Sequence, residues 1–166
     1  MKMYPLEPAG DDLLRRAQAH SVAEREIPVS AEHLFATLEE GPTWCKFFPV
    51  IRKVEWTSPK PFGEGTTRTV TVIGRIRLDE VFWSWKPGTR MGFAISAASN
   101  QMLKGLVELY DVLPIDDRHC KMRWEMGMEL AGRASVAESS MPSSLKRTQS
   151  WCMKRLERLA VRSLHG

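Results

Sequence analysis

The sequence lacks most of the features that mark membrane, secreted or disulfide-bonded proteins. No apolar run approaches the roughly 18 residues that a membrane-spanning helix needs. The first twenty residues have no apolar core of the kind found in signal peptides, and they include two aspartates. Only three cysteines occur, and their wide spacing favours reduced thiols: Cys45, Cys120 and Cys152. These absences predict a cytoplasmic protein.

The signatures of several catalytic chemistries are absent as well. The four histidines show no ligand spacing with cysteines or acidic residues, so we expect no metal site and no cofactor: His20, His33, His119 and His165. There is no G-x-S-x-G motif and no glycine-rich phosphate loop, and Cys45 has no evident histidine partner. The net charge of +4 permits an anionic partner, but no basic and aromatic surface motif indicates nucleic-acid binding.

What is present fits a single globular domain. A chain of 166 residues with 43% hydrophobic and 27% charged residues can bury a substantial core. We interpret residues 1–20 as an N-terminal extension in which Asp11 caps a short helix through Leu13, Leu14 and Ala17. The packing of this extension is left open. Residues 21–166 form the single domain.

The most informative stretch, residues 66–85, predicts a β-hairpin folded about Gly74. Counting outward from that glycine pairs Arg68 with Glu80 on the face that carries four aliphatic side chains: Val70, Val72, Ile76 and Leu78. Because alternate residues of a strand face opposite sides, this charged pair is expected in, or at the mouth of, an interior. The pattern suggests a cavity with a polar anchor. A structural ion pair at the sheet edge, or a slipped register that exposes both side chains, are the alternatives.

The other patterns predict a strand, two short helices, six further strands and a long C-terminal helix. Ser30 is a good N-cap for the helix that follows the first strand. Strands are expected at residues 21–29, 50–57, 91–98, 104–113 and 120–130, the second short helix at 43–48, and loops at 115–119 and 131–144. In the strand at 50–57, one face should carry Val50, Val54 and Trp56.

The last helix, at about residues 142–164, is amphipathic and cationic. Its inner stripe is expected to be Leu145, Thr148, Cys152, Leu156, Leu159, Ala160 and Ser163. Six cations and one acid, Glu157, cover the rest, which favours a solvated face and allows peripheral contact with an anionic membrane or an acidic partner. One long helix with one apolar stripe must lie against one face of a twisted antiparallel sheet, and a hollow can remain between them.

Several segments, in this order, resemble the helix-grip fold of the START, birch-pollen-allergen and polyketide cyclase superfamily, known as SRPBCC. The segment EREIPVSAEHLFATL resembles the first strand and helix of that fold. The segment WCKFFPVIRKVE resembles its aromatic-proline turn into the second strand. Later segments are similar to its third strand, its fourth strand and its last hairpin: FGEGTTRTV, LDEVFWSWKPGTRMGF, and ELYDVLP followed by KMRWEMGMEL. The resemblance covers roughly residues 22–165.

This resemblance implies an α+β helix-grip fold, in which a curved seven-stranded antiparallel sheet wraps around the C-terminal helix and two short helices follow strand one. It also implies an apolar cavity that binds lipids, sterols, polyketides or other hydrophobic molecules, so residues 21–166 are expected to be a ligand-binding domain. Some members of the superfamily are enzymes and many only bind. Fold alone therefore leaves the function open.

The candidate site combines the charged pair with aromatic, aliphatic and methionine side chains, which make good walls for hydrophobic ligands. Arg68 can hold a ligand carbonyl, phenolate or carboxylate, with Glu80 orienting it or acting as acid and base; Tyr110 is the third catalytic candidate, although its facing is open. The expected ligand contacts are Phe47, Phe48, Trp56, Arg68, Val70, Leu78, Glu80, Phe82, Phe93, Tyr110, Met122, Trp124, Met126, Cys152 and Leu156.

Two tryptophans of the fourth predicted strand leave a question of facing. Trp83 and Trp85 fall on the opposite parity from Phe82. Either a bulge resets the alternation there, or both tryptophans lie on the outside of the sheet.

Three functions are compatible with these patterns. A carrier or sensor of a hydrophobic small molecule needs a roomy apolar cavity with one polar anchor. A cyclase-, aromatase- or dehydratase-like enzyme needs at least two polar groups that converge inside the cavity. A protein-interaction module would have its cavity filled by tryptophan and methionine side chains. The chain is expected to act as a monomer or dimer.

Overall fold

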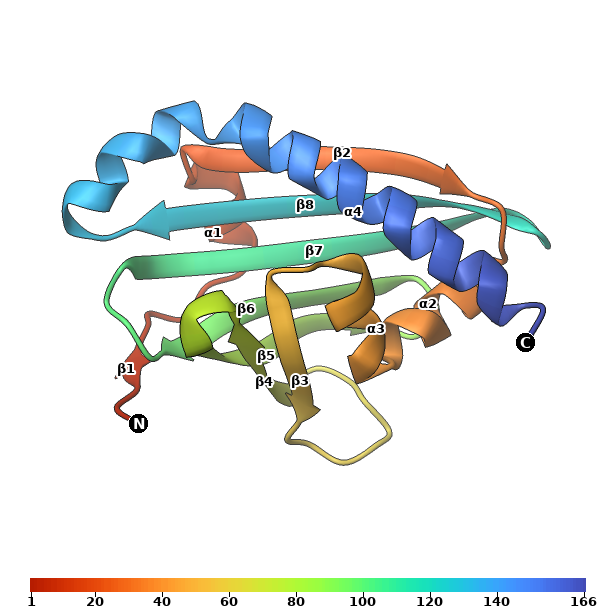
Figure 1. Ribbon diagram of the computed structural model, residues 1–166, viewed down its shortest axis with the longest axis horizontal. Coiled ribbons are helices and arrows are strands. Elements are labelled where there is room, and N and C mark those ends of the chain that lie inside the picture. The colour runs from red at the N-terminus through yellow and green to blue at the C-terminus, as the bar shows by residue number, and fades with distance from the viewer.

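The structure is a computed structural model that describes all 166 residues, and it has the α+β helix-grip fold that the sequence predicts (Figure 1). The elements are β1 (Tyr4–Pro5), α1 (Asp11–Arg16), β2 (Ala19–Ile27), α2 (Ala31–Glu39), α3 (Gly41–Phe47), β3 (Ile51–Trp56), β4 (Thr67–Val72), β5 (Ile76–Lys86), β6 (Arg90–Ala98), β7 (Leu103–Asp116), β8 (His119–Leu130) and α4 (Pro142–Ser163), with 3-10 turns at Ile73–Arg75 and Gly132–Ser140. None of the helices combines the length and the apolar character needed to cross a membrane.

All strand pairs are antiparallel, and the order across the sheet is β2-β8-β7-β6-β5-β4-β3, with the two-residue β1 added beside β6. The long helix α4 lies across the concave side, where it packs along β2 and against α3 (Figure 1). The main core therefore lies between the sheet, α4 and the two short helices α2 and α3.

Local chemistry explains the two short helices. The Ser30 side chain accepts a hydrogen bond from the His33 amide at 3.2 Å, which caps α2. Pro42 occupies the first turn of α3, where its missing N–H costs nothing. Both helices turn apolar residues inward, and the buried ones include Leu34, Phe35, Leu38, Trp44 and Phe47.

The hairpin of β4 and β5 has the predicted register. Arg68 lies opposite Glu80, and Val70 lies opposite Leu78. Gly74 has a φ of 77°, a left-handed conformation that glycine adopts without a steric penalty, so it allows the turn. The charged pair is therefore on the concave side, as the alternation predicted.

Three details of the sequence prediction differ from the structure. Val50 is 39% exposed and Ile51 is buried instead, because an irregularity between Ile51 and Lys53 shifts the facing of β3. The expected loop at residues 115–119 is shorter, since β7 continues to Asp116 and β8 begins at His119. The expected loop at 131–144 contains 3-10 turns, and Glu138 anchors it by accepting a hydrogen bond from the Leu130 amide.

The inner stripe of α4 also differs from the prediction in part. Cys152, Leu156 and Ala160 are buried, but Thr148 and Ser163 are exposed, and the buried positions that were missed are Gln149 and Met153. Gln149 can be buried because both ends of its amide are paired: it accepts from Ser21 Oγ at 2.5 Å and donates to the Trp124 carbonyl at 3.1 Å.

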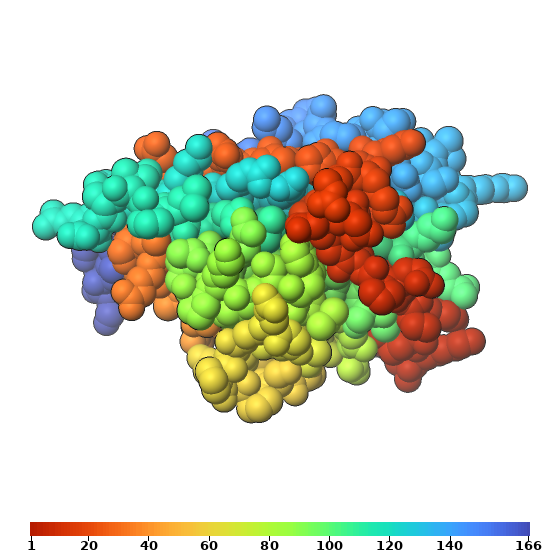
Figure 2. Space-filling model, turned by 180° about the vertical axis from the view of Figure 1, so that it is seen from behind, coloured from red at the N-terminus to blue at the C-terminus, as the bar shows by residue number.

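Part of the convex side of the sheet is covered by the N-terminal residues, whose helix α1 packs on β7 and β8 (red in Figure 2). Leu13 and Leu14 of α1 pack there against Ala94, Val107 and Leu109 in a second, smaller core. The N-cap of α1 is Gly10, so the prediction that Asp11 caps it was wrong by one residue.

A bulge separates the two tryptophans of β5. The register shifts between Phe82 and Ser84, and Trp85 consequently turns into the core, where it meets Phe35 edge-to-face at 5.6 Å. Trp83 stays on the convex side and packs against Gly10. Of the two alternatives that the sequence left open, the bulge is confirmed, and the alternative that both tryptophans lie outside the sheet is wrong.

Candidate functional site

One end of the concave core contains a cavity of about 180 Å³. Its walls come from β3, β4, β5, β7 and β8, with further residues from α4 and the turn after α3. Ten lining residues are apolar and two are glutamates: Phe48, Val50, Ile51, Val70, Val72, Leu78, Glu80, Leu106, Glu108, Met126, Met128 and Leu145. The candidate site is therefore an apolar cavity that contains two carboxyl groups.

Glu80, on β5, is one of the two carboxyls, and it is 5% exposed. Its Oε2 atom accepts a hydrogen bond from Arg68 Nε of β4, and the two side chains form a buried ion pair. Burial raises the pKa of Glu80, and the neighbouring guanidinium opposes that shift. Because a guanidinium stays charged at physiological pH, this contact favours the ionised form of Glu80.

Arg68 itself is 1% exposed and does not line the cavity. Aromatic rings surround its guanidinium, with Cζ 4.1 Å from the ring centre of Trp44 and 4.5 Å from that of Phe93. Its Nη1 atom has no hydrogen-bond partner, and the negative faces of these rings provide the compensating attraction. Arg68 is therefore placed to hold Glu80 in its charged form and in position, and it does not itself reach the cavity lining.

Glu108, on β7, is the second carboxyl, and it is also 5% exposed. Its Oε2 atom accepts hydrogen bonds from the Tyr110 hydroxyl at 2.6 Å and from Trp124 Nε1 at 2.9 Å. Burial and, to a smaller extent, the charge of Glu80 raise the pKa of Glu108 to about 7, although the hydrogen bonds from Tyr110 and Trp124 and the charge of Arg68 act in the opposite direction. Near neutral pH the Glu108 carboxyl is therefore partly protonated and partly ionised.

The remaining oxygen of each carboxyl is free. All hydrogen bonds from the protein go to the Oε2 atoms of Glu80 and Glu108. Neither Oε1 atom is among the fully buried atoms that lack a partner, and both residues line the cavity. The two Oε1 atoms are thus the polar groups available to a molecule inside it.

The structure brings some of the predicted ligand contacts to the cavity and places others elsewhere. Phe48, Val70, Leu78, Glu80 and Met126 line it. The others lie in the closed part of the core: Phe47, Trp56, Arg68, Phe82, Phe93, Tyr110, Met122, Trp124, Cys152 and Leu156. Trp56 is partly buried there, and the other nine are almost completely buried.

Tyr110 faces inward and stacks between rings of the two neighbouring strands. Its ring centre lies 6.0 Å from Phe93 and 5.1 Å from Trp124, with interplanar angles of 18° and 23°. Burial and the contact with Glu108 raise the pKa of Tyr110 well above its usual value, so the phenol stays protonated. Its role in this geometry is to position Glu108 by donating a hydrogen bond.

Sequence reasoning missed Glu108, the residue that completes the site. It shares the parity of Leu106, Tyr110 and Val112, so the alternation placed it with the inward residues once Tyr110 was known to face inward. That facing could not be read from the sequence, because Val107 and Leu109 on the other face are also buried, under α1.

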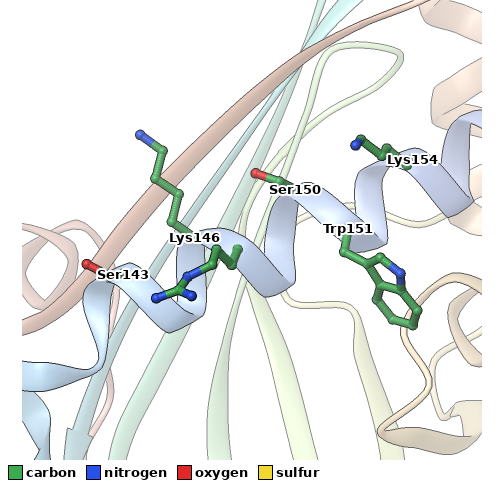
Figure 3. A pocket seen from close by; sticks show the side chains of 6 residues that line it. Ser143, Lys146, Ser150, Trp151 and Lys154 are labelled. Atoms are coloured by element: carbon green, nitrogen blue, oxygen red, sulfur yellow. The ribbon is translucent and has the colours of Figure 1, made fainter.

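A second hollow lies on the outer side of α4 (Figure 3). It is lined by side chains of this one helix: Ser143, Lys146, Arg147, Ser150, Trp151 and Lys154. Trp151 points away from Lys146 and Lys154 in this view, and it is largely exposed. Peripheral contact of this cationic face with a membrane stays a prediction. Among His, Cys, Asp and Glu side chains, no group of three or more could hold a metal ion.

Fold and cavity together define a helix-grip, START-like protein whose sheet and C-terminal helix enclose an apolar pocket. The chain belongs to the polyketide cyclase/dehydrase and lipid transport family, whose sequence model matches residues 18–161. The uncharacterized protein Rv2574 of Mycobacterium tuberculosis is 38% identical over 135 residues, which are 81% of this chain and 80% of that protein.

Solved structures show the same fold at low sequence identity. The Zhui aromatase/cyclase of a Streptomyces species superposes with a TM-score of 0.71 at 12% identity, over 87% of this chain and 94% of that one. A START superfamily protein from Mycobacterium smegmatis gives a TM-score of 0.66 at 10% identity, over 84% and 98% of the two chains. These likenesses confirm the predicted fold, and the family match over residues 18–161 confirms the predicted superfamily.

Proposed function

We propose that the protein binds a small hydrophobic molecule in the cavity between the sheet and α4, as a carrier or sensor. The observation that supports this most directly is the cavity itself, an apolar space that the surrounding side chains leave open in an otherwise densely packed interior. Ligand sites of proteins are typically concave, mainly apolar and equipped with few polar groups, and this site has that composition. A cytoplasmic location would keep its three free thiols reduced.

The volume limits the size of the ligand. An apolar cavity of about 150 Å³ is enough to hold benzene, whereas pockets for drug-sized ligands measure about 300–1,000 Å³. At about 180 Å³ this cavity accepts one ring or a short alkyl chain. A longer ligand requires the flexible wall residues Met126, Met128 and Leu145 to move aside.

A second candidate function is a dehydratase- or cyclase-like enzyme, and the pair of glutamates in one cavity favours it. Two carboxyls with different protonation states can divide the roles of acid and base. In such a dehydration Glu108 gives its proton to a leaving hydroxyl, which departs as water, while Glu80 takes a proton from the neighbouring carbon. The test is loss of water from a small β-hydroxy ketone, followed by the absorbance of the enone, with Glu108→Gln expected to abolish it.

The third candidate, an interaction module with a filled cavity, has partial support. The half of the core around Arg68 is packed by aromatic rings, but the cavity beside it is open. If no small molecule occupies the open half under any condition, this function becomes the preferred one.

Native mass spectrometry of freshly purified protein tests the proposed function. We expect a co-purifying compound, released on denaturation, and its loss in Val70→Phe, which places a ring in the cavity. Val136→Phe is the matched control, because Val136 is 80% exposed and remote from the cavity lining. Equal occupancy in both variants would place the ligand elsewhere.

A further inference from the structure

We propose that the two glutamates select a neutral alcohol or phenol, held by its hydroxyl group, and reject carboxylic acids. This inference rests on the proposed function and names the class of ligand that the same cavity takes. It commits to the hydroxyl group because the polar part of the cavity consists of two carboxyl oxygens and no cation.

The free Oε1 atoms of Glu80 and Glu108 have complementary hydrogen-bonding roles. Glu80 is paired with Arg68, and its free Oε1 atom can only accept a hydrogen bond while the group is ionised. Glu108 already accepts from Tyr110 and Trp124 through Oε2, so a proton on this carboxyl belongs on Oε1, which faces the cavity. The site therefore presents one acceptor and one donor.

A hydroxyl group combines both complementary functions, because it donates one hydrogen bond and accepts others. A ligand carboxylate offers no hydrogen to Glu80, and it brings a like charge into a cavity with ten apolar lining residues. A fatty acid, the expected cargo of a simple lipid carrier, is therefore disfavoured unless its carboxyl stays outside. The ring-sized volume favours a phenol or a short-chain alcohol.

The protonation of Glu108 makes binding depend on pH. The groups that face this carboxyl are Arg68 and Glu80 from β4 and β5, Tyr110 and Trp124 from β7 and β8, and the Cys152 thiol from α4. The pKa of Cys152 is raised to about 12 by burial, and that of Tyr110 lies well above its usual value, so neither titrates near neutrality. Glu108 is then the group whose proton is lost as the pH rises through about 7.

Calorimetric titration of the full chain with four probes that share one methyl-substituted benzene ring tests the proposal: toluene, 4-methylphenol, 4-methylbenzoate and 4-methylbenzylamine. At pH 6 we expect 4-methylphenol to bind about tenfold more tightly than toluene, and 4-methylbenzoate to be the weakest. Between pH 6 and 8.5 the affinity for 4-methylphenol should fall several-fold. This range lies below the ionisation of a phenol, near 10.

Glu108→Gln separates recognition from a structural role. Its amide can accept from Tyr110 and Trp124 and still present an N–H to the cavity, so it mimics the protonated form. We expect the variant to bind 4-methylphenol at pH 6 and to keep that affinity at pH 8.5. Glu55→Gln, a change at an exposed glutamate of β3, should leave the pH dependence of the parent protein intact.

The outcomes distinguish failure of this proposal from failure of the proposed function. Equal binding of toluene and 4-methylphenol, with both lost in Val70→Phe, would keep the cavity as a binding site and overturn hydroxyl selection. Tight binding of 4-methylbenzoate, or of 4-methylbenzylamine with affinity rising above pH 7, would overturn it in the same way. If none of the four probes binds, and native mass spectrometry finds no occupant, the binding function itself is wrong.

Discussion

Arg68 and Glu80 face each other across β4 and β5 and form an ion pair in which the two side chains are 1% and 5% exposed. Removing one partner of such a pair leaves an uncompensated buried charge, whereas replacing both with apolar residues does not. Comparing single and double variants of this pair therefore tests whether both side chains are buried and charged in the folded protein.

Arg68→Met should destabilise the protein by about 3–5 kcal/mol, because Glu80 then lacks its cationic partner. The double variant Arg68→Met/Glu80→Leu should recover most of this loss in urea-induced unfolding. Arg52→Met serves as a control, since Arg52 is an exposed residue of β3. A double variant no more stable than the single one would show that the arginine acts through its packing against the rings.

Glu108 should make the stability of the fold depend on pH. Its pKa is about 7 in the folded protein and near 4.5 when the chain unfolds, so the folded state holds the extra proton between these values. The associated stability is fully present below about pH 4.5 and is lost as the pH rises through 7; the loss amounts to about 3 kcal/mol.

Thermal unfolding of the parent protein and of Glu108→Gln between pH 5 and pH 8 measures this contribution. The difference in stability between the two proteins should move in favour of the variant as the pH rises from 5 to about 7, and then level off toward pH 8. A constant difference across this range would mean that Glu108 titrates as an ordinary exposed carboxyl.

The helix α1 should contribute to stability through the convex face. Leu13 is 1% exposed, and Leu13→Ala is expected to cost about 2–5 kcal/mol. Leu164→Ala, at the exposed end of the chain, should have little effect. Gly127→Val provides an independent check, because a Cβ there would lie 3.2 Å from the Leu13 carbonyl oxygen and 3.3 Å from Leu14 Cα, so it should displace α1 from the sheet.

The three thiols should differ in reactivity. Cys120 and Cys152 are buried, and burial raises their pKa values to about 11 and about 12, so little thiolate is present at pH 8. Cys45 is partly exposed. Iodoacetamide treatment of the native protein should therefore give one adduct, at Cys45, in peptide mass spectrometry. Rapid modification of Cys152 would instead indicate that the interface between α4 and the sheet opens in solution.

The fold was predictable because strand alternation and helix capping are local signals. The pairing of Arg68 with Glu80 followed from the distance of each residue to Gly74, and the structure confirms it. The error at Ile51 occurred where an irregularity interrupts the alternation of β3. The bulge between Phe82 and Ser84 was one of two alternatives, and the sequence did not decide between them. A sequence read at a fixed period of two cannot locate such insertions.

The candidate site was less predictable than the fold, for a different reason. Alternation shows which side chains point inward, but it does not show which part of the interior their neighbours fill. Whether the space beside Glu80 stays open depends on the combined volumes of rings from α3, β3, β5 and β6, which are far apart in the sequence. Glu108 was missed because burial under α1 made both faces of β7 apolar.

The division of the interior into a ring-packed half and an open half has an evolutionary consequence. The aromatic rings around Trp44 and Phe93 pack the first half tightly. The residues that border the open half take little part in that ring packing. Substitutions at Val72, Leu106 or Met128 could therefore reshape the recognised compound while the scaffold stays intact. A few side-chain changes at one end of this helix-grip fold would thus alter which compound fits without disturbing the rest of the core.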